Sequence, residues 1–267
     1  MTMTKRVLVT GGGTFLGDYI AAALLAEGAD VTLLVRPGAE ENIGPLGEHV
    51  RWFTADVWEP SSLKGRARGH HTVIHTVGSL TADPSRGLTY HYLNFVSARN
   101  VANMCVNSGA PHLMLLSGVH APWVNGTYIQ TKREAEKYIE RLGINYTIIR
   151  APLTYVRGAH RPLFYRVMSL FRYIPPLNWL AFNRIAPMPV DILARGVARL
   201  VLEPDTQPKH IYYAQDLRRR NSDQEKKRGR VPLNAPPTVN APSGFDPFEP
   251  PLQEGDTAKF QWKPPER

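Results

Sequence analysis

Short apolar runs alternate with longer amphipathic stretches over residues 6–150. Continuous apolar runs are typical of parallel strands that are buried on both faces. Stretches with apolar residues three or four positions apart are typical of helices that cover such strands. The pattern therefore predicts an α/β fold, a doubly wound parallel sheet with helices on both faces. The predicted strands are Val7–Thr10, Val31–Val35, Val50–Thr54, Thr72–His75, Leu113–Leu116 and Tyr146–Arg150.

The predicted helices of this half each run up to a glycine. Glycine is a common helix stop because it adopts the left-handed conformation that ends many helices. A further helix is predicted later in the chain, over Asp191–Leu202. The three helices of the first half are Leu16–Ala26 near Gly28, Leu93–Ser108 before Gly109 and Tyr128–Leu142 before Gly143.

The alternation loosens in the last part of the chain. The sequence predicts a smaller region over residues 155–216. Its segment 161–187 is rich in aromatic residues and arginine, and we expect a helix there that is broken at Pro175-Pro176. Residues 217–267 predict an extended tail, basic at first and then rich in proline. Proline-rich polar sequence does not pack a core of its own.

The formal net charge of the 267 residues is +9, which favours anionic partners such as a phosphorylated cofactor, an acidic protein or an anionic membrane surface. No interleaved aromatic and basic pattern accompanies this charge, so nucleic acid is disfavoured as a partner. Cys105 is the only cysteine, which excludes an intrachain disulfide and a cysteine metal site; we expect no bound metal. No apolar run is long enough for a spanning helix or a signal peptide, which predicts a cytoplasmic protein.

The most informative segment is the glycine turn between the first strand and the first helix, Thr10-Gly11-Gly12-Gly13-Thr14-Phe15-Leu16-Gly17. Glycines let the backbone turn tightly and bring N–H groups against a pyrophosphate at the positive end of a helix. An ordinary strand-to-helix turn is the alternative, since glycine patterns alone are weak signals. The strand, the turn and the helix agree with one another here, so the sequence predicts a Rossmann-type dinucleotide site.

This turn resembles the Thr-Gly-x-x-Gly-x-x-Gly fingerprint of the extended and atypical short-chain dehydrogenases/reductases. Gly11 and Gly17 match its first and third glycines, whereas Thr14 stands at the middle glycine and Gly13 comes one position early. The resemblance covers residues 5–214. It implies a nicotinamide dinucleotide as the bound partner and cofactor contacts from Thr10, Gly11, Gly13, Thr14, Phe15, Leu16 and Gly17.

Residues after the next strands extend the resemblance. Asp56-Val57 resembles the family's pair at the adenine edge, and Thr76-Val77-Gly78 follows the strand that passes the ribose and pyrophosphate. Asn94 resembles the family's helix asparagine. Arg36 ends the second strand, where an acid would bind a ribose 2′-hydroxyl; arginine suits a 2′-phosphate and predicts NADP(H) rather than NAD(H). A solvated surface arginine is the alternative.

The candidate reaction centre is the Tyr-x-x-x-Lys pair of Tyr128 and Lys132. Residues four apart share one face of a helix, so the ammonium can hold the nicotinamide ribose and lower the pKa of the phenol. Tyr128 would then donate or accept a proton near neutral pH. Ser117 is the third candidate catalytic residue, at the end of the fifth strand. The better alignment with the family places Gly118 there, and His120 is an alternative donor.

The pattern from Ser117 to Asp191 is similar to the NmrA-like branch, which includes a nucleotide-binding accessory subunit of respiratory complex I. We therefore predict an NAD(P)-binding domain over 1–154, a substrate or docking region over 155–216 and the tail over 217–267. Three functions stay open. The first is an NADP(H)-dependent oxidoreductase that acts on a fairly apolar small molecule. The second is a non-catalytic accessory subunit, docked through 161–187 and 217–267 at the cytoplasmic side of a membrane complex. The third is an RNA-binding relative of the fold.

Overall fold

The computed structural model describes residues 5–157, 183–203 and 210–227. A seven-stranded sheet runs through its centre in the order β3-β2-β1-β4-β5-β6-β9, and every neighbouring pair is parallel. The order reverses between β1 and β4, which creates the crevice where open α/β sheets bind ligands. The strands are β1 (Arg6–Gly12), β2 (Asp30–Val35), β3 (Arg51–Thr54), β4 (Thr72–His75), β5 (His112–Gly118), β6 (Asn145–Ala151) and β9 (Ile211–Tyr213).

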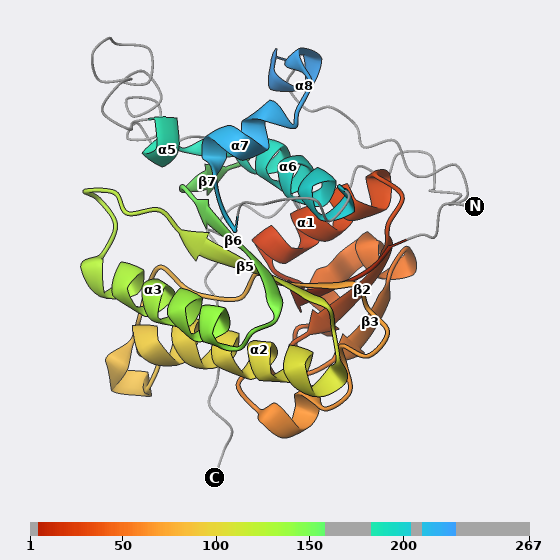
Figure 1. Ribbon diagram of the computed structural model, residues 1–267, viewed down its shortest axis with the longest axis vertical. Coiled ribbons are helices and arrows are strands. Elements are labelled where there is room, and N and C mark those ends of the chain that lie inside the picture. The colour runs from red at the N-terminus through yellow and green to blue at the C-terminus, as the bar shows by residue number, and fades with distance from the viewer. Residues whose placement is uncertain (1–4, 158–182, 204–209, 228–267) are drawn as a thin grey trace.

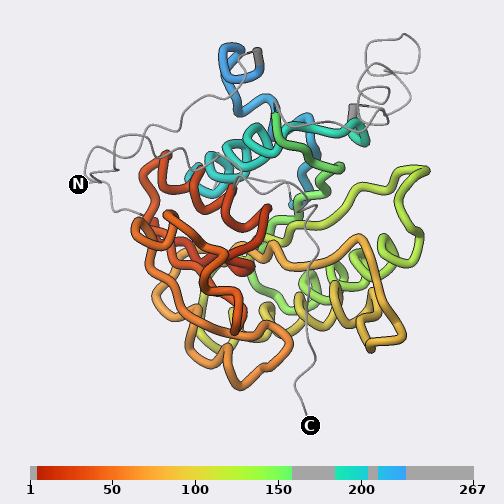
Figure 2. The backbone as a smooth tube through the Cα atoms, turned by 180° about the vertical axis from the view of Figure 1, so that it is seen from behind, coloured from red at the N-terminus to blue at the C-terminus, as the bar shows by residue number. Residues whose placement is uncertain are grey.

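Helices cover both faces of the sheet, as Figure 1 shows. Alternate residues of β1 enter the two sides of the core: Val7 and Val9 pack with α1 and α6, and Leu8 packs with α2 and α3. Figure 2 shows α1 and α6 side by side from behind. The helices are α1 (Phe15–Ala26), α2 (Ser97–Ser108), α3 (Gly126–Arg141), α5 (Asn183–Ile185), α6 (Val190–Leu202), α7 (Ala214–Arg219) and α8 (Asp223–Lys227).

The six predicted strands are confirmed, and so is the Rossmann-type fold. The predicted helix over Leu93–Ser108 begins differently: a π-helical turn, η4 (His91–Val96), leads directly into α2. The short 3₁₀ helices η1 (Glu40–Glu48), η2 (Pro60–Leu63) and η3 (Pro84–Arg86) complete the connections. Among the described residues, no helix combines the length and the apolar character needed to cross a membrane.

Two pairings join the later part of the chain to the sheet domain. The strand β9 adds to β6 through Ile148, Ile149 and Arg150, and sequence analysis did not predict it. A separate two-stranded parallel sheet forms from β7 (Thr154–Tyr155) and β8 (Met188–Pro189). Most of the segment 161–187, with the expected break at Pro175-Pro176, lies outside the described residues.

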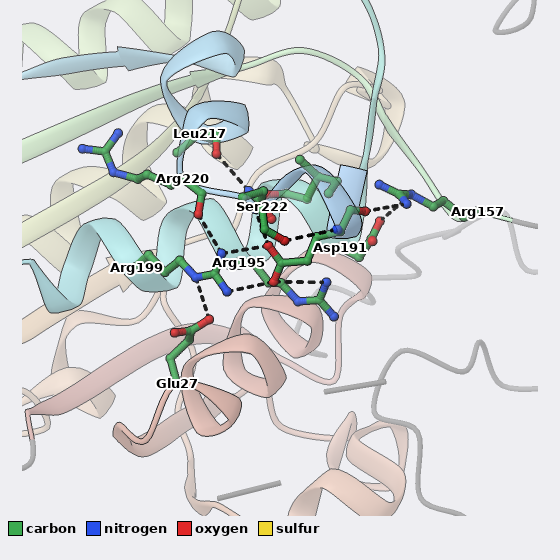
Figure 3. A network of polar contacts seen from close by, with 11 residues as sticks. Glu27, Arg157, Asp191, Arg195, Arg199, Leu217, Arg220 and Ser222 are labelled. Atoms are coloured by element: carbon green, nitrogen blue, oxygen red, sulfur yellow. Dashed lines mark hydrogen bonds and ion pairs between the residues drawn. The ribbon is translucent and has the colours of Figure 1, made fainter. Parts of the chain in front are cut away.

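The basic segment expected to be extended from residue 217 instead forms the end of α7 and the short helix α8, up to residue 227. Leu217 of α7 is fully buried against α6, so this part belongs to the core. Figure 3 shows the ion network beneath it: Arg199 of α6 donates to Glu27, which follows α1, at 2.7 Å and to Glu225 of α8 at 2.8 Å. These contacts hold residues 214–227 on the domain, and the proline-rich residues 228–267 lie outside the described residues.

Candidate functional site: a dinucleotide cradle beside a Tyr-x-x-x-Lys helix

The glycine turn joins β1 to α1 at the crevice, and two of its glycines are required by close approach. Gly11 has a φ of +87°, and a Cβ there would lie 2.6 Å from the Thr76 hydroxyl. A Cβ on Gly17 would lie 2.1 Å from the Gly11 carbonyl oxygen. No side chain therefore fits at the first and third glycines of the fingerprint, where the turn folds tightly onto the helix start.

Thr14 uses its hydroxyl inside the turn. The hydroxyl donates to the Gly11 carbonyl at 2.5 Å and accepts from the Gly17 N–H at 3.4 Å, so Thr14 is the N-cap of α1. The Thr14 side chain thus adds to the backbone contact of the turn, in which the Thr14 N–H donates to the same Gly11 carbonyl at 3.2 Å. Phe15, the first residue of α1, stays exposed and packs on Tyr19, while Leu16 is partly buried against the core.

Asp18 lies directly beneath the turn, and sequence analysis missed it. Its carboxylate accepts the Gly13 N–H at 2.8 Å. Burial raises the pKa of Asp18 to about 7, although the hydrogen bond from Gly13 acts in the opposite direction. A single acidic residue in the otherwise apolar start of α1 is the signal that could have identified it. A carboxyl group therefore titrates near neutrality beside the predicted phosphate site.

The carboxyl ends of β1 and β4 are tied together at the crevice. The Thr10 hydroxyl is hydrogen-bonded to His75 Nδ1 at 2.9 Å, and the Thr76 hydroxyl donates to the Thr10 carbonyl. His75 is fully buried, and burial together with the positive charge of Lys132 lowers its pKa to about 3. A neutral histidine thus fixes the strand ends. The structure places Thr76 and Val77 next to the turn: Val77 Cγ2 lies 3.1 Å from the Cβ position of Gly11.

Arg36 follows β2, and the negative charge of Asp56 acts on it. Burial lowers the pKa of Arg36, and the negative charge of Asp56 opposes that shift. The Asp56 carboxylate also accepts the Trp58 N–H at 2.9 Å, and Val57 is buried in the core below. The structure therefore brings the residues expected at the adenine end together on the β2 side of the crevice.

Lys132 reaches from α3 to the loop after β4. A Cβ on Gly78 would lie 2.6 Å from Lys132 Nζ and 2.6 Å from the Asn94 side-chain oxygen, so the ammonium passes closely over this glycine. Lys132 Nζ also donates to the Leu116 carbonyl at 3.2 Å. Asn94 is fully buried and holds Ser79 through its amide. The helix thereby delivers a buried ammonium to the same crevice as the glycine turn.

Tyr128 lies one turn before Lys132, which is 5.9 Å from the centre of its ring. Burial raises the pKa of the Tyr128 phenol to about 12, and the nearby charge of Arg133 only partly opposes this. Burial lowers the pKa of Lys132 to about 8, against the influence of Glu136. The expected lowering of the phenol pKa is not found, because desolvation of the phenolate outweighs the positive charge of Arg133 nearby.

Ser117 faces away from the phenol, into a buried network on α3. Its hydroxyl donates to Glu136 at 2.6 Å and accepts from Arg133 at 3.2 Å. Arg150 of β6 donates to the same carboxylate at 2.6 Å. Gly118 is the residue that contacts Tyr128, because successive residues of a strand point to opposite faces. The structure thus brings Tyr128 and Lys132 together and assigns Ser117 to the network of Glu136.

The cradle fits a nicotinamide dinucleotide. The tight glycine turn, the start of α1 and the crevice at the strand reversal are the features that hold a pyrophosphate. Lys132 lies beside Gly78, farther along the crevice. Within the described residues, no group of three or more acidic, histidine or cysteine side chains is arranged to hold a metal ion.

Comparison with protein families supports the same cofactor. Residues 11–160, more than half of the chain, match the profile of a family described as NAD(P)H-binding. The match begins in the glycine turn and extends past the helix of Tyr128 and Lys132.

Curated relatives resemble parts of the chain. Ceramide reductase of Caulobacter vibrioides is 26% identical over 216 residues, 80% of this chain and 65% of that protein. Human sterol-4-alpha-carboxylate 3-dehydrogenase is 29% identical over 113 residues, 42% of this chain and 29% of that protein. The chain therefore spans less than two thirds of the length of these relatives.

Solved structures share the fold. The Bordetella bronchiseptica enzyme WbmG in complex with NAD superposes with a TM-score of 0.58 at 17% identity, covering 79% of this chain and 72% of that one. A dTDP-glucose 4,6-dehydratase of Streptomyces venezuelae gives 0.54 at 20% identity, covering 74% and 72%. With the family match and the geometry of the crevice, the chain belongs to the NAD(P)H-binding family, as an extended short-chain dehydrogenase/reductase-like protein.

Proposed function

We propose that this protein is an NADP(H)-dependent oxidoreductase that interconverts a carbonyl and a hydroxyl group on a fairly apolar small molecule. The observation that carries the proposal is the placement of Lys132 over Gly78 with Tyr128 one helical turn away. An ammonium that binds the ribose and a phenol that faces the substrate are the two protein groups this reaction needs.

The two residues act by binding and by proton transfer. When bound, the cofactor supplies or accepts the hydride. A phenol whose pKa is about 12 is protonated at neutral pH, so Tyr128 is prepared to donate its proton to a carbonyl oxygen. Lys132, with a pKa of about 8, is largely charged at neutral pH and stabilises the phenolate that remains. The protonated phenol is therefore in the state that carbonyl reduction requires.

The preference for NADP(H) over NAD(H) rests on Arg36. It stands at the end of β2 in the place of the acid that binds a ribose 2′-hydroxyl, and a guanidinium there suits a 2′-phosphate. The negative charge of Asp56 nearby acts to raise the pKa of Arg36 and so favours the charged guanidinium that a 2′-phosphate would need.

The apolar substrate class rests on the relatives' names and on composition. Two of the similar proteins are a ceramide reductase and a vestitone reductase, and both names denote reduction of largely apolar molecules. The aromatic-rich residues expected to cover the substrate lie outside the described residues.

Titration of the protein with NADPH and NADH, followed by nucleotide fluorescence, tests the cofactor assignment. We expect NADPH to bind more tightly, and Arg36→Ala to remove the difference while Arg68→Ala, which changes an exposed arginine, preserves it. Equal affinities in the unaltered protein, unchanged by Arg36→Ala, would contradict the NADP(H) assignment. Oxidation of NADPH by apolar ketones and aldehydes, followed by absorbance, tests the reaction itself.

A second candidate, a nucleotide-binding accessory subunit without turnover, is favoured by Gly118. The family's hydroxyl-bearing residue is replaced there by a glycine. In that case the protein would dock onto a partner or an anionic membrane surface through 161–187 and 217–267, which lie mostly outside the described residues. Two results together would favour this candidate. The protein would retain tightly bound NADPH but turn over no carbonyl compound, and a partner that copurifies with it would be lost on truncation after Lys227.

A further inference from the structure

Three arginines gather where β5, β6 and β9 end, next to the candidate reaction centre. Arg133 of α3 and Arg150 of β6 both donate to Glu136, whose side chain is only 6% exposed. Arg150 also donates to the Tyr213 hydroxyl at 3.0 Å. The guanidinium carbon of Arg184 lies 4.8 Å from the centre of the Tyr213 ring. A continuous chain of contacts thus joins the three cations, two of them at the carboxylate of Glu136 and the third at the Tyr213 ring.

This cluster carries an excess of positive charge. Its three guanidinium groups and one carboxylate sum to +2, since Ser117 and Tyr213 contribute neutral hydroxyls. The side chains of Arg133 and Arg150 are only 25% and 21% exposed, so water screens them incompletely. Partly buried cations of one sign favour a further anion at the site.

The segment that precedes Arg184 brings no counter-ion of its own. Residues 158–182 contain three arginines and no aspartate or glutamate. An anionic ligand is therefore the natural complement to the cluster.

The cluster adjoins the phenol through one residue. Arg133 Nη2 donates to the Gly118 carbonyl at 2.9 Å, and the Tyr128 ring packs against the α-carbon of the same glycine. Glu136 and Tyr213 fix the arginines in position, which lowers the entropy lost when a ligand binds. Guanidinium groups bind carboxylates and phosphates through paired hydrogen bonds.

We propose that Arg133 and Arg184 bind an anionic group, a carboxylate or a phosphate, on the substrate whose reacting oxygen faces Tyr128. Arg150 and Glu136 are positioning residues that hold Arg133. This inference rests on the proposed oxidoreductase function and refines its substrate class to an apolar molecule with an acidic end.

Anion binding to the NADPH-loaded protein provides the first test, because bound cofactor covers the phosphate-binding turn. Inorganic phosphate and benzoate are titrated separately by calorimetry at low ionic strength. We expect at least one of them to bind. Arg133→Met and Arg184→Ala should each weaken that binding about tenfold, because each variant loses a charge-assisted hydrogen bond. Arg51→Ala, which removes an exposed arginine paired with Asp30, leaves it unchanged. The stronger of the two probes identifies the carboxylate or the phosphate class.

Arg184 is exposed, so its replacement leaves the core intact and keeps the test valid if Arg133→Met is unstable. Failure of both anions to bind, or equal binding by the unaltered protein and Arg184→Ala, overturns the anion site. The reaction is scored separately, with a keto acid and its methyl ester as matched substrates. Anion binding without any turnover contradicts the oxidoreductase proposal alone, whereas equal turnover of acid and ester contradicts the anion site alone.

Discussion

The phenol of Tyr128 packs directly over the α-carbon of Gly118. A Cβ at residue 118 would lie 2.9 Å from the Tyr128 hydroxyl oxygen and 2.8 Å from Cε1, closer than van der Waals contact permits. The Tyr90 ring closes the other side at 6.3 Å between ring centres. Gly118 therefore determines where the hydroxyl of Tyr128 lies, because a side chain at residue 118 would collide with the phenol.

Gly118→Ala should displace the Tyr128 hydroxyl and lower kcat by about tenfold to a hundredfold, because small displacements of a reacting group are costly. NADPH affinity should stay the same, since the three atoms nearest to a Cβ at residue 118 all belong to Tyr128. Gly126→Ala, at the start of the same helix and with open space around its α-carbon, is the matched control. Steady-state kinetics and NADPH titration measure both effects. A Gly118→Ala protein with the original kcat would show that the position of the phenol does not matter.

Tyr128→Phe should reduce turnover by about a hundredfold or more while sparing cofactor binding, because it removes only the proton donor. Lys132→Met should impair both, since the ammonium also reaches the crevice at Gly78. Lys137→Met changes an exposed lysine of the same helix and serves as the control. Turnover is followed by NADPH absorbance and binding by NADPH fluorescence. Rates in Tyr128→Phe equal to the original would remove this residue from the mechanism.

NADPH binding should weaken as the pH rises through about 7, where Asp18 loses its proton. A charged carboxylate on the Gly13 N–H repels the cofactor phosphates and competes for the same donor, whereas the protonated form carries no charge and is a weaker acceptor. The affinity should fall by up to about tenfold per pH unit above that value, the limit for one linked proton. Asp18→Asn should flatten the profile. An identical pH slope in Asp18→Asn would assign the titration to another group.

The same shift affects stability. Because the pKa of Asp18 in the folded protein lies above its unfolded value, the folded state binds the extra proton between the two pKa values. The stability contributed by this proton is present at low pH and is lost as the pH rises through about 7. Asp18→Asn should accordingly make the free energy of unfolding less dependent on pH in that range, as denaturant titrations at several pH values would measure.

Glu225→Gln should lower the free energy of unfolding by about 1 to 3 kcal/mol, typical for breaking a partly buried polar network. Glu225 joins α8 to Arg199 and accepts the Ser222 N–H at 2.6 Å. Burial acts against its charge, but hydrogen bonds from Arg199 and Ser222 lower the pKa of Glu225 to about 2. The network therefore stabilises the fold at neutral pH and weakens as the pH falls from about 4.5 toward 2.

Asp223→Asn is the control for Glu225, because Asp223 pairs with Lys226 at the surface and is 84% exposed. Exposed pairs contribute little to stability. Chemical unfolding of both variants decides the matter: similar small effects would show that the network of Figure 3 does not hold α8.

The sequence by itself determined the parallel sheet, the glycine turn and the Tyr128–Lys132 pair. These features are local: apolar runs such as Val7–Thr10 show burial on both faces, and the spacing of four residues places two side chains on one helical face. The strand order and the covering helices then follow from short right-handed connections.

Only the tertiary structure decided the features that depend on contacts between residues far apart in the sequence. Strand β9 has only three residues, too few for a periodic signal, and it forms because β6 offers an open edge. Whether Ser117 or Gly118 contacts the phenol depends on how β5 is oriented against α3. The structure places Glu136 opposite Ser117. The pKa shifts of Asp18 and Tyr128 arise from desolvation, a property of the packed environment that the order of residues does not reveal.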